Sequence, residues 1–209
     1  MLEISDILEV RKHIEGLKAV IFDLDDTLYS EKEYVRSGYR KITEVLPQVE
    51  NVAEKLWKLF EEKKPAIDEL LKQAKIDSEE VKQSCLHAYR YQIPDIHLYE
   101  GVVEMLEEFR ANGLKLGIIT DGRPEGQRAK LQVLGIETMV DEIIVTDEFG
   151  GPEFRKPNQK AFVTMKERLG VDYTEMCYVG DNTKKDYIAP EQLGMRSIWF
   201  KNKDGLYVK

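Results

Sequence analysis

The sequence has few of the residues that mark several common classes of site. It contains two cysteines, Cys85 and Cys177, and three histidines, His13, His87 and His97. Two cysteines so far apart make neither a disulfide framework nor a zinc-binding spacing, so we expect reduced, buried thiols in a cytoplasmic protein. The histidines lack the spacing of metal ligands and are expected to be structural.

Positive charge and long apolar runs are also scarce. The chain has 31 basic and 39 acidic residues, which gives a formal net charge of −8 at pH 7. This charge opposes non-specific attraction to nucleic-acid phosphates. No apolar stretch approaches the length of a membrane span, and residues 1–16 lack the basic and apolar regions of a signal peptide. We therefore expect neither nucleic acid nor membrane as a partner.

The most informative feature that is present is an apolar run that ends abruptly at two acids. Residues 19–22 read Ala-Val-Ile-Phe, and Asp23 and Asp25 follow at once. Such a run is typical of a strand buried on both faces of a parallel sheet. Ligands bind beyond the carboxyl ends of such strands. Two acids crowded there raise each other's pKa unless a cation intervenes, and a divalent metal is such a cation.

The rest of the chain alternates between strands and helices, with one helical insertion. Residues 1–16 have apolar positions at helical spacing and predict an amphipathic N-terminal helix. Residues 31–92 read as helix throughout and predict a small bundle. Strands are expected at 114–120, 142–146, 176–179 and 196–200, and helices at 101–111, 125–134, 159–169 and 188–193. Short links between alternating elements imply a parallel sheet, so the predicted fold class is α/β with a Rossmann-like core.

Each strong candidate residue lies just after one of these strands. Asp23 and Asp25 follow the first strand, Thr120 ends the second, and Asp181 follows the fourth. Lys156 lies in the loop after the third strand. Because the carboxyl ends of parallel strands share one edge, these side chains are expected to converge. Carboxylates, a hydroxyl and an ammonium around one cleft are what phosphoryl transfer through an aspartyl phosphate requires.

The expected roles follow from charge. Asp23 would attack phosphorus with the help of Mg²⁺, and Asp181 and the backbone carbonyl of Asp25 would complete the protein's ligands. The Asp25 side chain would protonate the leaving oxygen and then activate water. Thr120 and the backbone N–H groups after it would hold the phosphate, and Lys156 would balance its charge. Asp186 is expected beside the metal ligands, where it would orient metal-bound waters or Lys156. Asp121 and Gly122 are assigned to phosphate binding. Lys184 and Lys185 are expected to face solvent, and the alternative is that they help to attract an anionic substrate.

Four segments together resemble the haloacid dehalogenase-like hydrolase superfamily. The segment 23–28, Asp-Leu-Asp-Asp-Thr-Leu, is similar to its first motif, and 120–122, Thr-Asp-Gly, to its second. Lys156-Pro157 resembles the third motif, and the segment from Gly180-Asp181 to Asp186 resembles the fourth. All four occur in order, so the match is far more specific than any single motif.

The resemblance implies a catalytic core over 1–29 and 94–209 and a helical cap domain over 30–93, as in the phosphoglycolate-phosphatase-like subfamily. It also implies a phosphatase, since dehalogenases of this superfamily lack an acid at the position of Asp25. One departure is Asp121, where Asn is frequent. Its side chain could point away, pair with Arg123 or contact substrate.

The expected function is Mg²⁺-dependent hydrolysis of a small phosphorylated metabolite by a monomer or homodimer. Two alternatives stay open. A phosphomutase or phosphotransferase would pass the same phosphoryl group to a sugar hydroxyl, and a catalytically weak protein would mainly bind a ligand or partner. The full set of Asp23, Asp25, Thr120, Lys156 and Asp181 argues against the second alternative.

Overall fold

The computed structural model describes residues 1–206, and over these residues the strands form one six-stranded sheet. The strand order is β1-β6-β5-β2-β3-β4, and every pairing is parallel. This confirms the predicted α/β fold class. The strands are β1 (Leu2–Ile4), β2 (Ala19–Phe22), β3 (Lys115–Thr120), β4 (Glu142–Val145), β5 (Met176–Gly180) and β6 (Arg196–Phe200).

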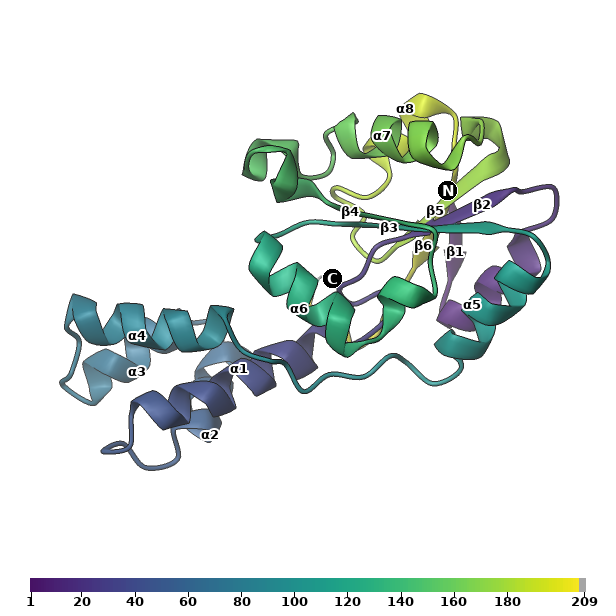
Figure 1. The fold of residues 1–209 in the computed structure, drawn as a ribbon. Coiled ribbons are helices and arrows are strands. Elements are labelled where there is room, and N and C mark those ends of the chain that lie inside the picture. The colour runs from purple at the N-terminus through teal and green to yellow at the C-terminus, as the bar shows by residue number, and fades with distance from the viewer. Residues whose placement is uncertain (207–209) are drawn as a thin grey trace. The chain divides into compact units, whose positions relative to one another are not determined.

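Helices cover both faces of the sheet (Figure 1). On one face lie α7 (Lys160–Leu169) and α8 (Ile188–Leu193), and on the other lie α5 (Val102–Ala111) and α6 (Pro124–Val133). β2 and β5 are buried along their whole length, because both faces are covered. Short 3₁₀ turns complete the connections, namely η1 (Ile7–His13), η2 (Ile136–Thr138), η3 (Thr146–Phe149), η4 (Pro152–Phe154) and η5 (Tyr173–Glu175).

The prediction of an amphipathic helix over residues 1–16 is wrong. Leu2–Ile4 instead form β1, the edge strand, which pairs with β6. The helical part is the 3₁₀ turn η1, in which the Asp6 side chain accepts a hydrogen bond from the backbone N–H of Leu8. The apolar spacing fits either conformation over so short a segment. The open edge of β6 favours the strand, because its backbone N–H and C=O groups would lack partners if residues 2–4 formed a helix.

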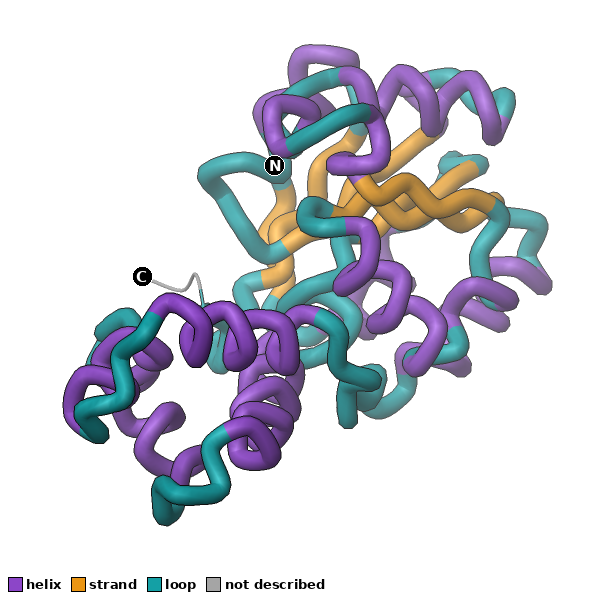
Figure 2. Tube along the Cα trace, turned by 60° about the vertical axis from the view of Figure 1, so that its left-hand side comes forward, coloured by secondary structure: helices purple, strands orange, loops and turns teal. Residues whose placement is uncertain are grey.

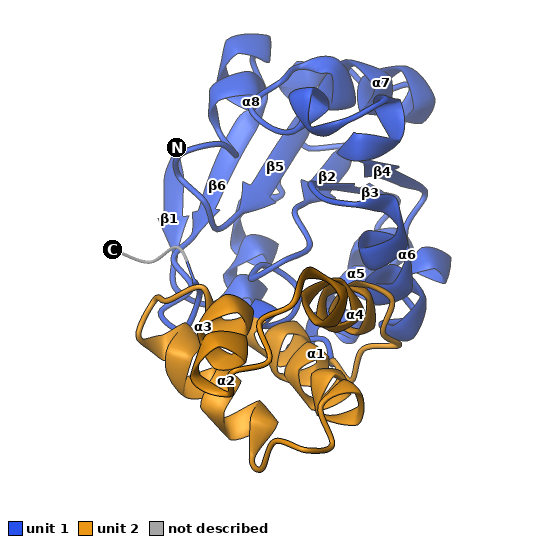
Figure 3. Ribbon diagram, turned by 90° about the vertical axis from the view of Figure 1, so that its left-hand side faces the viewer, with its two compact units in different colours: residues 1–31, 97–209 blue, residues 32–96 orange. Residues whose placement is uncertain are grey.

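The chain divides into two compact units (Figure 3). Unit 1 comprises residues 1–31 and 97–206 of the described chain and holds the sheet. Unit 2 comprises residues 32–96. In Figure 2 the strands form a single layer, and unit 2 contains helices and loops.

The helices of the insertion are α1 (Glu31–Val45), α2 (Val52–Glu61), α3 (Ala66–Gln73) and α4 (Glu79–Arg90). Their apolar faces form a core of their own, which is separate from the core that the sheet forms with α7 and α8. Leu56 of α2, Leu70 of α3 and Cys85 of α4 are almost fully buried there. An independent core explains why the insertion forms a unit of its own. Within the described residues, no helix combines the length and apolar character that crossing a bilayer requires.

Candidate active site

The register of three neighbouring strands brings distant segments to one edge of the sheet. Phe22 of β2 pairs with Ile118 of β3 on one side and with Val179 of β5 on the other. Asp23 therefore leaves β2 level with the end of β3, where Thr120 lies, and its backbone N–H donates to the Val179 carbonyl at 2.8 Å. The carboxyl ends of β2, β3 and β5 therefore lie at one edge of the sheet.

A buried lysine links two carboxylates at this edge. The Nζ atom of Lys156 lies 2.8 Å from Oδ1 of Asp23 and 2.8 Å from Oδ1 of Asp186, and it donates to the Tyr178 hydroxyl at 2.8 Å. The Lys156 side chain is fully buried. Burial alone would lower its pKa, but the carboxylates of Asp186 and Asp23 raise the pKa well above its usual value. Lys156 therefore stays charged.

One lysine does not balance the acids around it. Carboxylate oxygens of Asp23, Asp181 and Asp186 lie within 4.8 Å of one another. Burial raises the pKa of Asp181 to about 9, with Asp23 and Asp186 adding to the effect. Burial also raises the pKa of Asp23 to about 6, against the opposing charge of Lys156. An all-oxygen set with surplus negative charge fits a hard divalent cation such as Mg²⁺.

The Asp25 carboxylate is held by a different group of side chains. Its Oδ1 accepts from Lys130 Nζ at 2.6 Å and from the Tyr29 hydroxyl, and its Oδ2 accepts from Gln127 Nε2 at 2.9 Å. Burial would raise the pKa of Asp25, but Lys130 and these hydrogen bonds hold it below its usual value. Gln127 Nε2 also donates to the hydroxyl of Thr120, which is fully buried. Asp25 and Thr120 are thus joined through one amide.

The Asp121 side chain ties three segments together. Its Oδ1 accepts from the Thr146 hydroxyl and from the backbone N–H of Lys156, each at 3.0 Å, and its Oδ2 pairs with Lys185 Nζ at 2.9 Å. Although burial opposes it, the charges of Lys156 and Lys185 lower the pKa of Asp121. The negative charge at this position is therefore matched by Lys185. The expectation that Lys185 faces solvent is wrong, since only 29% of its side chain is exposed.

Gly122 follows with a φ of 141°, which strongly favours glycine. A Cβ atom there would also lie 3.2 Å from Cγ of Gln127. Any larger residue would therefore strain the turn and press on the amide that joins Asp25 to Thr120.

Sequence reasoning missed several contributors, among them Gln127, Lys130, Tyr178 and Lys185. Gln127 and Lys130 are polar residues of a surface helix, where such residues normally face solvent. Their spacing of i and i+3 places them on one face of α6, and this was the only available signal.

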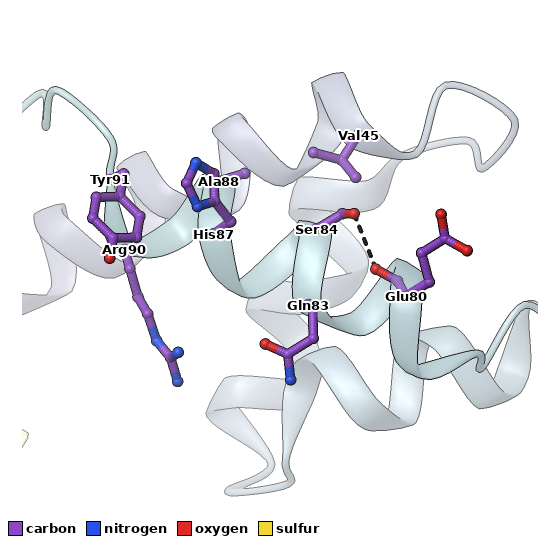
Figure 4. A pocket seen from close by; sticks show the side chains of 8 residues that line it. All are labelled: Val45, Glu80, Gln83, Ser84, His87, Ala88, Arg90 and Tyr91. Carbon is purple, nitrogen blue, oxygen red and sulfur yellow. Dashed lines mark hydrogen bonds between the residues drawn. The ribbon is translucent and has the colours of Figure 1, made fainter.

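A hollow of about 690 Å³ lies within unit 2 (Figure 4). Val45 of α1 borders it, and the other residues come from α4 and from Tyr91, which follows that helix. The rings of His87 and Tyr91 lie tilted against each other there with centroids 4.5 Å apart, and the Ser84 hydroxyl donates to the backbone carbonyl of Glu80. None of the predicted site residues lines this hollow.

Known proteins resemble this chain in sequence and in fold. The family model described as haloacid dehalogenase-like hydrolase matches residues 20–200. A glyceraldehyde 3-phosphate phosphatase of Methanocaldococcus jannaschii is 31% identical over 194 residues, which cover 87% of this chain and 84% of that protein. A protein of the same name from Methanopyrus kandleri is 32% identical over 196 residues, covering 87% and 83%.

Solved structures show the same fold. A HAD-superfamily hydrolase of subfamily IA from Geobacter sulfurreducens matches with a TM-score of 0.66 at 19% identity, covering 88% of this chain and 87% of that one. A HAD phosphatase from Thermococcus onnurineus matches with a TM-score of 0.55 at 27% identity, covering 88% and 86%. The family resemblance predicted from the four motifs is confirmed, and the chain belongs to the haloacid dehalogenase-like hydrolases.

Proposed function

We propose that the chain is a Mg²⁺-dependent phosphatase that hydrolyses a small phosphomonoester through an aspartyl phosphate on Asp23. The observation that carries the proposal is the buried group in which Asp23 meets Lys156 and the acids Asp181 and Asp186. A buried carboxylate beside a permanent cation and an oxygen-rich cation site suits attack on a phosphate ester.

In the first step, an Asp23 oxygen bonds to phosphorus, and the bond to the leaving oxygen breaks. Asp25 gives the leaving oxygen a proton. The ion pair with Lys130 favours the ionised form of Asp25, but a bound phosphate dianion raises the pKa of nearby acids and so favours protonation. In the second step, Asp25 takes a proton from the water that attacks phosphorus, and this frees Asp23 and inorganic phosphate.

The other residues hold the transferred group. The Thr120 hydroxyl and the backbone N–H groups of Asp121 and Gly122 would bind phosphate oxygens, and Lys156 would offset their charge. Asp23, Asp181 and the Asp25 carbonyl would hold Mg²⁺, with Asp186 beside them. The ion would neutralise the carboxylate and phosphate oxygens together.

Substrate choice is proposed to reside in unit 2, as the helical cap domain that the family resemblance implies. The relatives named as glyceraldehyde 3-phosphate phosphatases support a small phosphorylated metabolite, and glyceraldehyde 3-phosphate is the first candidate. Buried free thiols at Cys85 and Cys177 support a cytoplasmic enzyme, and the net charge of −8 supports the absence of a nucleic-acid partner.

The test is hydrolysis of p-nitrophenyl phosphate and of a panel that includes glyceraldehyde 3-phosphate, phosphoserine, sugar phosphates and nucleotides. We expect turnover with Mg²⁺ that disappears with EDTA and in Asp23→Asn. Asp172→Asn, which changes an exposed acid, is the matched control. Undiminished turnover in Asp23→Asn would remove Asp23 as the nucleophile, and inactivity on the whole panel would favour a binding protein.

A further inference from the structure

Helix α6 presents two buried polar side chains to the site. Gln127 is 3% exposed and Lys130 is 4% exposed, although both residue types normally face water. α6 lies on the face of the sheet opposite α7 and α8 (Figure 1), and it starts just after the loop that follows β3. Burying an ammonium and an amide costs free energy unless each finds partners, so their partners indicate what the helix does.

Both side chains converge on the carboxylate of Asp25. Lys130 pairs with Oδ1 and Gln127 donates to Oδ2, so each oxygen is held from the same helix. Arg128, on the same helix, instead makes a two-pronged exposed ion pair with Glu148, with both bonds at 2.8 Å. One face of α6 thus contacts Asp25 in the site, and the face that carries Arg128 is exposed.

Gln127 adds a second constraint. Its Nε2 atom donates both to Asp25 and to the Thr120 hydroxyl, and so sets the separation of these two groups. Thr120 is proposed to bind the phosphate, and Asp25 to serve its leaving oxygen. A single amide therefore links the group proposed to bind the phosphate with the group proposed to protonate its leaving oxygen.

We propose that Gln127 and Lys130 are positioning residues that aim the Asp25 carboxyl at the leaving-group oxygen. This inference rests on the proposed function. An aspartate side chain turns about two bonds, and the two anchors from α6, together with the Tyr29 hydroxyl, restrict that freedom. A displacement of about 1 Å at a reacting group can cost about 100-fold in rate, which sets the scale of the expected effect.

The test uses substrates that differ in their need for a proton. p-Nitrophenolate leaves without protonation, whereas the alkoxide of glyceraldehyde 3-phosphate requires it. The measured quantity is kcat/KM, which covers only the steps up to the phosphoenzyme. In Lys130→Met and Gln127→Leu we expect a loss of roughly 100-fold for the alkyl ester and of less than about 5-fold for the aryl ester. Should the panel reject glyceraldehyde 3-phosphate, its best alkyl phosphate replaces it.

Controls separate positioning from general damage. The ratio of the two kcat/KM values does not depend on the folded fraction, so a partly unfolded variant still gives an answer. Arg128→Met, on the outer face of α6, should leave the ratio unchanged. Lys130→Arg, which keeps the charge, should recover part of the ratio, and it replaces Lys130→Met if that variant does not fold.

A double-mutant cycle tests whether Lys130 acts through Asp25. In an Asp25→Asn background, Lys130→Met should change the alkyl-ester rate by less than about 3-fold, because the group that it positions is already gone. Equal losses for both esters, or losses that multiply in the double variant, would overturn the inference. Retained activity in Asp23→Asn would instead overturn the proposed function, so the two failures are distinct.

Discussion

Asp181 is predicted to destabilise the metal-free protein, and replacing it by Asn should reveal this. Burial and the neighbouring acids raise its pKa from 3.8 to about 9. The folded state therefore binds a proton that the unfolded chain has released. Stability is lost as the pH rises from about 4 toward 9, at about 1.4 kcal/mol per pH unit.

The size of the effect follows from the same pKa. pH 7 lies about three units above 3.8, the pKa of Asp181 in the unfolded chain. At pH 7 the raised pKa therefore lowers the free energy of unfolding by at most about 4 kcal/mol. Asp181→Asn keeps the shape of the side chain and cannot ionise. In EDTA, the free energy of unfolding of Asp181→Asn relative to that of the wild type should therefore increase by about 3 kcal/mol between pH 5 and pH 7. Titrating groups that do not interact with residue 181 are common to both proteins and cancel in the difference.

The assay is urea unfolding in EDTA at several pH values, repeated with Mg²⁺. With the ion at 100 times its Kd, the wild type should gain about 2.7 kcal/mol, and Asp181→Asn should gain much less because it lacks a ligand. Asp172→Asn, which alters an exposed carboxylate, should show no such pH-dependent gain. The reasoning would be refuted if the difference in free energy of unfolding between the wild type and Asp181→Asn stayed constant from pH 5 to pH 7.

Three further changes test other parts of the structure. Lys156→Met leaves the buried carboxylates of Asp23 and Asp186 uncompensated, and should lower the free energy of unfolding in urea by roughly 3–5 kcal/mol. Gly180→Ala places a Cβ atom 2.5 Å from an Asp186 oxygen; we expect about 1–3 kcal/mol of destabilisation in the same assay and weaker Mg²⁺ binding by calorimetry. Ile4→Ala should cost about 2–5 kcal/mol if β1 is part of the core, since Ile4 is 3% exposed, and a cost under about 0.5 kcal/mol would contradict that place in the sheet.

The sequence predicts the sheet and the meeting of its strand ends because parallel strands follow a simple rule. A buried apolar run points to a strand, and its carboxyl end points to the site. Asp23 and Thr120 follow directly from this argument, and register then places them on one edge. The edge strand β1 does not follow, since three residues carry no period that separates strand from helix.

Side chains that support the site are harder to predict. Gln127, Lys130 and Lys185 are polar residues in helices or turns, and in sequence they look like solvent-facing positions. Their burial depends on which acid lies opposite, which only the three-dimensional structure determines. For Asp121 the sequence left three possibilities, and the structure gives it a partner, Lys185, that was not among them.

The central claim is that Asp23 carries the phosphoryl group during turnover. Borohydride added to the enzyme with Mg²⁺ and substrate in the steady state reduces an acyl phosphate to an alcohol, and peptide mass spectrometry locates the change. The account predicts reduction at residue 23 that depends on substrate and is absent in Asp23→Asn. Sustained turnover with residue 23 unmodified, or reduction at another carboxylate, would contradict it.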